Sequence, residues 1–379
     1  MRRKKIAIVN RTNLKNYGSV LQVYALCQAI GKFGYDSEVV WQSGNMSKNY
    51  DLRPNKAIKT AFKLICHPTL LISTFKTIRE VKSIVIDEDK IKRFDKFVSD
   101  NFVQSFYASD EIEMIAASAS YSKFVCGSDQ VWCTTTLYPD PMMYLRFAPK
   151  SKRVAYAPSL GRNYIPNFNK RILKKYISDV PCLSVREDEG SRLIKELTGR
   201  EALVVADPTL LLRSCEWDKL KVPLKLPVSY VLCYFLDEPN IAVKMAIVKY
   251  AQMCNLDIVV LGVLGDVNYP ANRVHHPSAG PGEFLTIVSQ AQMVITDSYH
   301  GMLFAINYQR NFWSVERAYS QFDQSSRQLT VLSRLNLENR YIKRDYHFSD
   351  EPINYNEVQS KIDKFVEFSL GYLKQSLEK

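Results

Sequence analysis

The sequence has no long apolar run. No stretch reaches the ~18 uncharged apolar residues that a membrane-spanning helix needs. The chain starts with the basic residues 1–5, and the apolar run after them ends at Asn10, short of the roughly 7–15 apolar residues of a secretory signal. These absences predict a soluble protein of the cytoplasm.

The sequence also lacks the motifs of several enzyme classes. None of its eight cysteines forms a Cys-x-x-Cys pair, so we expect reduced thiols and no metal site. The Gly-x-Gly-x-x-Gly, P-loop and Gly-x-Ser-x-Gly patterns are missing, which argues against dehydrogenases, kinases and α/β-hydrolases. His275 and His276 have no third ligand at metal spacing, and we predict that they are a solvated pair.

Positive charge is what the chain has in excess. A net charge of +12 indicates an anionic partner. Residues 52–82 contain seven Lys or Arg residues and one acid, interleaved with apolar residues. This stretch is either a pair of ordinary surface helices with solvated lysines or a docking surface for the inner face of a membrane. No DNA- or RNA-binding motif is present, so we expect no nucleic-acid partner.

The apolar pattern predicts an α/β protein with two domains. A chain of 379 residues is too long for one ordinary core, and short apolar runs alternate with helical segments, which favours parallel sheets. One of the helices is predicted to span residues 87–106. We expect an N-terminal Rossmann-like domain at 1–180, a second one at 181–354, and an amphipathic helix at 355–379 that packs back on the N-terminal domain.

The first candidate site segment is Asp297-Ser298-Tyr299-His300-Gly301, which follows an apolar strand and begins a helix. Asp297 or Ser298 can cap the free N–H groups of that helix. His300 would then lie in the first turn, where N–H groups and the helix dipole favour an anion. A histidine there can take or relay a proton near neutral pH. The alternative is a capping histidine that bonds to the neighbouring backbone.

Arg186 is the second candidate, because it directly follows a buried apolar strand. Its planar guanidinium suits a carboxylate or a phosphate. The alternative is a structural ion pair with Glu187 or Asp188. A further polar loop at a strand end, which can offer N–H groups and side chains to a ligand, consists of Gly127, Ser128, Asp129 and Gln130.

Six segments then point to one family. They are NYGSVLQVYAL at 16–26, VCGSDQVW at 125–132, VAYAPSLG at 154–161, SVRE at 184–187, DPTLL at 207–211 and ITDSYHG at 295–301. Together and in this order they resemble the polysaccharide pyruvyl transferase family. The resemblance extends from residue 5 to about residue 340, which is nearly the whole chain.

The resemblance implies a fold like that of the GT-B glycosyltransferases, with two Rossmann-like domains facing a cleft, the acceptor side N-terminal and the donor side C-terminal. It also implies transfer of pyruvate from phosphoenolpyruvate to two hydroxyls of a sugar in a cell-surface polysaccharide or lipid-linked precursor. The products would be a cyclic ketal and phosphate, with no cofactor. His300 and Arg186 are the expected catalytic residues. The expected substrate-binding residues are Asn16, Gly18, Gln22, Gly127, Ser128, Asp129, Gln130, Ser159, Glu187, Asp297, Ser298, Tyr299 and Gly301.

One position departs from the family pattern. Some members have an arginine two residues before the histidine, where this chain has Ser298. Arg162 or Arg310 is a candidate to replace it. Two other functions remain open from the sequence: a GT-B-type glycosyltransferase that uses a nucleotide sugar, and a non-catalytic scaffold for glycan assembly.

Overall fold

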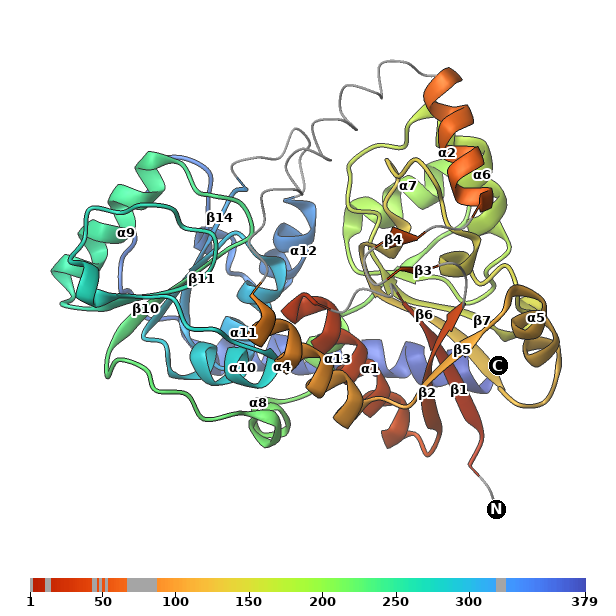
Figure 1. Ribbon diagram of the computed structural model, residues 1–379, viewed down its shortest axis with the longest axis horizontal. Helices are drawn as coiled ribbons and strands as arrows, with labels where there is room; N and C mark the ends of the chain where they lie inside the picture. The colour runs from red at the N-terminus through yellow and green to blue at the C-terminus, as the bar shows by residue number, and fades with distance from the viewer. Residues whose placement is uncertain are drawn as a thin grey trace.

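The computed structural model contains two parallel β-sheets, each flanked by helices (Figure 1). It describes residues 3–10, 15–42, 46–47, 50–51, 54–66, 87–317 and 325–379. Of the basic stretch 52–82, only residues 54–66 are therefore described. Within the described part of the chain, no helix is both long and apolar enough to cross a membrane.

The first sheet has the strand order β5-β2-β1-β6-β7, and all of its pairs are parallel. Its apolar runs form strands because both faces of the sheet are covered; every residue of β7, for example, is buried. The strands are β1 (Lys5–Val9), β2 (Asp36–Gln42), β5 (Gln104–Tyr107), β6 (Lys123–Asp129) and β7 (Arg153–Pro158).

The second sheet has the order β12-β11-β10-β13-β14-β15, again with every pair parallel. Two parallel sheets with crossover helices confirm the predicted α/β class with two Rossmann-like halves. The strands are β10 (Tyr230–Phe235), β11 (Asp257–Gly262), β12 (Val274–His275), β13 (Met293–Thr296), β14 (Asn311–Val315) and β15 (Tyr341–Ile342).

Helices and short strands complete the fold. The helices are α1 (Tyr17–Lys32), α2 (Pro54–Cys66), α4 (Glu88–Asn101), α5 (Ser109–Ala117), α6 (Asn167–Ser178), α7 (Asp188–Thr198), α8 (Ser214–Trp217), α9 (Ile241–Met253), α10 (Pro281–Gln290), α11 (Tyr299–Asn307), α12 (Ser326–Leu335) and α13 (Tyr355–Glu378). The short strands are β3 (Met46–Ser47), β4 (Tyr50–Asp51), β8 (Ser184–Val185) and β9 (Leu203–Val204).

The prediction of one helix over residues 87–106 was wrong in its second part. The helix α4 ends at Asn101, and Phe102 takes an extended conformation. The next residues form β5, which pairs with β2 along Val39–Gln42. Apolar residues continue through this stretch, so periodicity alone does not mark the change; pairing with the sheet edge decides it.

The strand β8 lies beside the first sheet. The amide of Ala155 in β7 donates to the carbonyl of Cys182 at 2.9 Å, just before β8 begins. The predicted boundary at residue 180 assigns this segment to the C-terminal half instead. The C-terminal helix α13 also contacts β7, because the Tyr372 hydroxyl donates to the Ala155 carbonyl at 2.9 Å.

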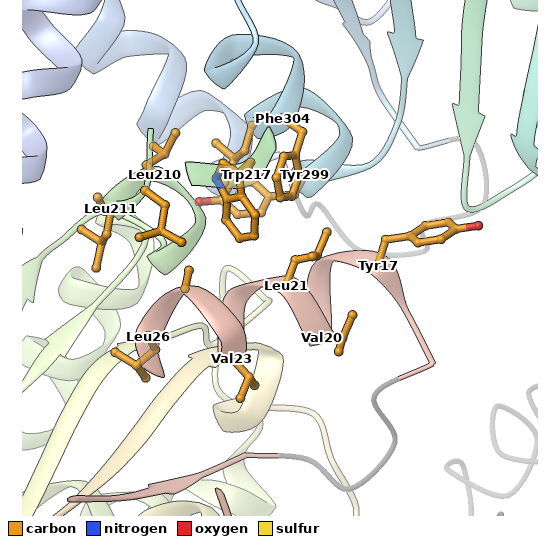
Figure 2. Packing of buried hydrophobic residues seen from close by; sticks show 14 of the residues in the cluster. Tyr17, Val20, Leu21, Val23, Leu26, Leu210, Leu211, Trp217, Tyr299 and Phe304 are labelled. Atoms are coloured by element: carbon orange, nitrogen blue, oxygen red, sulfur yellow. The ribbon is translucent and has the colours of Figure 1, made fainter. Parts of the chain in front are cut away.

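The helix α1 links the two halves (Figure 2). One of its faces covers the first sheet, and the other packs on residues of the C-terminal half such as Phe304. At its start, the Tyr17 ring stacks on Phe284 with centroids 4.6 Å apart, and the Tyr17 hydroxyl donates to Ala279 at 2.8 Å. Burying an aromatic side chain of this size stabilises the fold by roughly 1.5–3 kcal/mol. The start of α1 is therefore fixed against the second sheet and its helices.

Candidate active site

The N-termini of α1 and α11 meet at His300. A methyl group placed on Gly18 would lie 2.0 Å from the His300 Nδ1 atom, so only glycine permits this contact. Asn16 caps α1, accepting from the Ser19 amide, and Ser298 caps α11, accepting from the Gly301 amide. Both helix ends direct partial positive charge into the same region, which favours an anion there.

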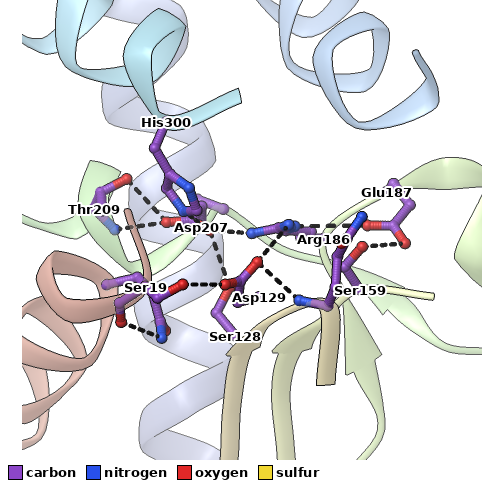
Figure 3. A network of polar contacts seen from close by, with 12 residues as sticks. Ser19, Ser128, Asp129, Ser159, Arg186, Glu187, Asp207, Thr209 and His300 are labelled. Carbon is purple, nitrogen blue, oxygen red and sulfur yellow. Dashed lines mark hydrogen bonds and ion pairs between the residues drawn. The ribbon is translucent and has the colours of Figure 1, made fainter. Parts of the chain in front are cut away.

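Arg186 lies at the centre of a buried polar cluster (Figure 3). Its Nη1 atom is 2.9 Å from Asp207 Oδ2, and its Nη2 atom is 3.3 Å from Asp129 Oδ1. The guanidinium carbon also lies 4.4 Å from the centre of the Tyr299 ring. Although burial lowers the pKa of Arg186, its neighbours Tyr299, Asp129 and Asp207 raise that pKa above its ordinary value. Arg186 is therefore charged and held from three sides.

Asp207 joins Arg186 to the histidine. It is fully buried and accepts hydrogen bonds from Ser128 Oγ at 2.9 Å and from the Thr209 amide at 3.0 Å. Its Oδ2 atom is 3.5 Å from His300 Nε2. Burial raises the pKa of Asp207, but the charges of His300 and Arg186 and the hydrogen bonds to the carboxylate outweigh it and lower that pKa. A buried acid paired in this way stays ionised.

Asp129 has a strained backbone. Its φ of 69° and ψ of −177° lie in a region that is essentially restricted to glycine, at a cost of about 1–3 kcal/mol. The side chain accepts from Ser19 Oγ at 2.6 Å and from the Gln130 amide at 2.8 Å. Burial raises the pKa of Asp129, but the charges of Arg186 and His300 outweigh burial, so this pKa lies below its ordinary value. With 22% of its side chain exposed, Asp129 is the accessible edge of the ion pair with Arg186.

Glu187 holds the loop after β7. Its Oε1 atom accepts from Ser159 Oγ at 3.0 Å and from the Leu160 amide at 2.7 Å. Burial raises the pKa of Glu187. The predicted alternative of an ion pair between Arg186 and Asp188 is wrong, because Asp188 binds Arg334. Glu187 does pair with Arg186, but at 3.8 Å it is farther from the guanidinium than Asp207 and Asp129 are.

Comparison with known proteins identifies the family of the chain that carries this buried cluster. The family model for polysaccharide pyruvyl transferases matches residues 16–319. The chain belongs to the polysaccharide pyruvyl transferase family. It is therefore a transferase, and the family implies a polysaccharide acceptor. No curated protein matches the chain.

Solved structures similar to this transferase include an epimerase and a glycosyltransferase. A UDP-GlcNAc 2-epimerase from Neisseria meningitidis has a TM-score of 0.47 and 11% identity, covering 98% of this chain and 94% of its own. The glycosyltransferase SnogD from Streptomyces nogalater has a TM-score of 0.43 and 11% identity, covering 100% of this chain and 96% of its own.

Several predicted binding residues of the transferase have packing positions in the fold. A methyl group on Gly127 would lie 2.6 Å from Leu26, and one on Gly301 would lie 2.7 Å from Thr296 Oγ1, so both glycines permit close packing. Gln22 is buried and donates to the Ser19 carbonyl at 2.9 Å.

Asp297 ties the ends of two strands of the second sheet together. Its carboxylate accepts from the amides of Leu236 at 2.7 Å and Asp237 at 3.1 Å, just after β10. Burial raises the pKa of Asp297 to about 6, although these amides and Arg317 lower it. The side chain thus supports the turn that positions His300, three residues later in the chain.

The sequence-based predictions missed Ser19, Asp207 and Arg327. Asp207 had a usable signal, since it is an acid at the end of an apolar strand within a motif that resembles the family. Arg327 on α12 is buried, and its pKa falls to about 10, mainly through burial and then through Arg186. Glu187 and Asp129 oppose that fall, which places Arg327 in the same cluster of charges.

The two arginines suggested as replacements for the one absent at 298 have different positions. Arg310 donates to the Tyr308 carbonyl at the C-terminal end of α11, the end opposite His300. Arg162 donates to the Gly161 carbonyl, on the loop that Glu187 holds. The two histidines of the predicted solvated pair have different surroundings. His275 Nε2 lies 2.8 Å from Asp257 Oδ2, whereas His276 lines a cavity.

Proposed function

We propose that this transferase moves the pyruvyl group of phosphoenolpyruvate onto two hydroxyls of one sugar, giving a cyclic ketal and phosphate. The acceptor in this proposal is a cell-surface polysaccharide or its lipid-linked precursor. The observation that carries the proposal is the convergence of His300, Arg186 and Asp207 where the N-termini of α1 and α11 meet. A proton-transfer group and an anion-binding group are thereby held in one place.

The donor carries a carboxylate and a phosphate, and the cluster offers cationic partners for both. Arg186 supplies a guanidinium, and the ends of α1 and α11 supply N–H groups. Arg327 takes the place of the arginine that is absent at Ser298, because it is buried within the electrostatic reach of Arg186.

The chemistry begins with a proton from His300 to the methylene carbon of the enol, which leaves positive charge on the neighbouring carbon. The first sugar hydroxyl attacks that carbon and forms a C–O bond, and its proton passes to a carboxylate for which Asp129 is the accessible candidate. The bond between that carbon and the bridging phosphate oxygen then breaks, and phosphate leaves with the proton held by the carboxylate. The second hydroxyl attacks the same carbon and closes the ketal, and its proton returns to His300. All atoms of the products come from the two substrates, so the proposed reaction includes no cofactor.

Replacing His300 with alanine tests this role. We expect acceptor-dependent phosphate release from phosphoenolpyruvate to fall roughly 10²–10⁴-fold, the usual contribution of a general acid or base. His347→Ala is the matched control, because His347 is exposed. The measurement is phosphate release over a panel of sugar acceptors. Unchanged release by His300→Ala would contradict the site, and binding of a UDP-sugar without phosphoenolpyruvate turnover would favour the glycosyltransferase alternative.

The helix α2 supports the proposed contact with a membrane. It exposes 66% of Ile58, 68% of Phe62 and 76% of Ile65, and the spacing of these residues places them on one face. Lys63 binds Asn169 of α6 at 2.7 Å, which holds the helix on the protein. We propose that this apolar face enters the interface of an anionic membrane, where a lipid-linked acceptor would lie.

The variant Ile58→Ser/Phe62→Ser/Ile65→Ser tests the docking face. We expect its binding to phosphatidylglycerol-containing vesicles to weaken at least ~10-fold, since the burial of three apolar side chains is lost. The control is Ile241→Ser/Met245→Ser/Met253→Ser on α9, whose side chains are equally exposed. Co-sedimentation at two salt concentrations is the measurement. Equal binding by wild type and the α2 variant, or loss only in the α9 variant, would contradict docking through α2.

A further inference from the structure

A cavity of about 390 Å³ lies beside the start of α1. Its wall combines the aromatic residues Tyr17 and Phe94 with the cationic or titratable side chains of Lys15, Lys90 and His276. They come from α1 and the residues just before it, from α4 and from the loop after β12, so the cavity lies between the two halves of the molecule. A volume of this size is in the range of small-molecule sites.

The polar side of the cavity has an excess of positive charge. Its carboxylate, Asp87, is committed to holding the backbone: one oxygen accepts from the Lys90 amide at 2.9 Å and the other from Ser278 Oγ at 2.9 Å. The Lys90 ammonium lies 5.0 Å from the centre of the Tyr17 ring, and burial lowers the pKa of Lys90. A partly desolvated ammonium group gains much from an anionic ligand.

The cavity and the candidate active site adjoin consecutive residues of α1. Tyr17 forms the wall of the cavity, and the next residue, Gly18, contacts His300. The cavity and the histidine therefore adjoin the same end of α1. Tyr17 is fixed by its stacking on Phe284 and by its hydrogen bond to Ala279, which makes this wall rigid.

We propose that this cavity binds the phosphate or diphosphate ester carried by the sugar acceptor and so directs the sugar hydroxyls towards His300. The inference rests on the proposed function, which supplies the sugar acceptor. Lys90, Lys15 and His276 face the ester oxygens, and Phe94 and Tyr17 face the adjoining apolar or ring atoms. A nucleoside diphosphate sugar and an isoprenoid diphosphate sugar share this chemistry.

Calorimetric titration of the full chain without phosphoenolpyruvate tests the cavity directly. The probes are inorganic pyrophosphate, UDP-N-acetylglucosamine and geranyl diphosphate. We expect all three to bind, with Kd rising at least ~10-fold in Lys90→Gln and in His276→Gln, because the first variant removes a cationic partner of the ester and the second removes an imidazole N–H partner. The matched control is Lys92→Gln on the same helix, whose side chain is 73% exposed; its Kd should equal that of wild type.

The outcomes separate the two proposals. Tighter binding of the nucleotide or of the geranyl probe than of pyrophosphate identifies which source of the ester fits. If no probe binds, or if Lys90→Gln and Lys92→Gln bind alike in correctly folded protein, the cavity proposal is overturned, whatever the turnover of phosphoenolpyruvate. If the probes bind as expected but phosphoenolpyruvate is not consumed, the proposed reaction fails and the ester site stands.

Discussion

Replacing Gly18 with alanine is expected to reduce transferase activity by at least ~10²-fold while leaving the protein folded. The added methyl group would lie 2.0 Å from Nδ1 and 2.2 Å from Cγ of His300, which is far inside contact distance. The imidazole must swing away or the two helix ends must separate. Misplacing a catalytic group by about 1 Å costs on the order of 10²-fold in rate. The strain itself costs about 1–3 kcal/mol of stability.

Gly31 supplies the matched control, because it lies in the same helix and, among the described residues, a methyl group placed there would meet nothing within 4 Å. Gly31→Ala should keep full activity and raise the free energy of unfolding by up to about 1 kcal/mol, since alanine favours a helix. Phosphate release and thermal unfolding of both variants measure the effects. Wild-type activity in Gly18→Ala would show that the contact with His300 has no catalytic role.

Replacing Arg186 with leucine is expected to lower the free energy of unfolding by about 3–5 kcal/mol at pH 7 and to abolish activity. The variant leaves the Asp207 carboxylate buried without its cation, and breaking one side of a buried pair has this cost. The folded-state pKa of Asp207 is lowered, so its stabilisation is present above the ordinary aspartate pKa of ~3.9 and is lost as the pH falls below it. Neutral pH is therefore the condition for the measurement.

A second substitution separates stability from chemistry. Arg186→Leu/Asp207→Asn removes both charges and should recover much of the lost stability without recovering activity. Arg192→Leu is the control, since that arginine is 48% exposed and its ion pairs should contribute no more than about 1 kcal/mol. Chemical denaturation together with phosphate release reads out both properties. Recovery of activity in the double variant would show that the reaction does not need the Arg186 guanidinium.

The positions of His300 and Arg186 could be predicted because local pattern determines them. Each follows an apolar strand, and the carboxyl ends of parallel strands gather at one edge of a sheet. The partners of Arg186 were harder to predict. Asp207 and Ser19 approach the cluster only through packing between segments distant in sequence, and Arg327 lies on a helix with no distinctive signal in the sequence.

Asn16, Ser298 and Asp297 show a different limit of prediction. Their side chains hydrogen-bond to backbone amides at helix starts and strand ends, which is a common use of short polar residues. In a sequence, a residue that caps a helix beside a site looks the same as one that binds a ligand there. Gly127 and Gly301 are ambiguous in the same way, because close packing and ligand approach both require a missing side chain.

The contact between Gly18 and His300 joins residues from the two halves of the molecule, so the candidate site depends on how the halves pack together and belongs to neither half alone. His300 is only 7% exposed and Arg186 only 1%, so the docked arrangement covers both side chains. The glycine contact and the burial of both side chains thus depend on the same packing of α1 against α11.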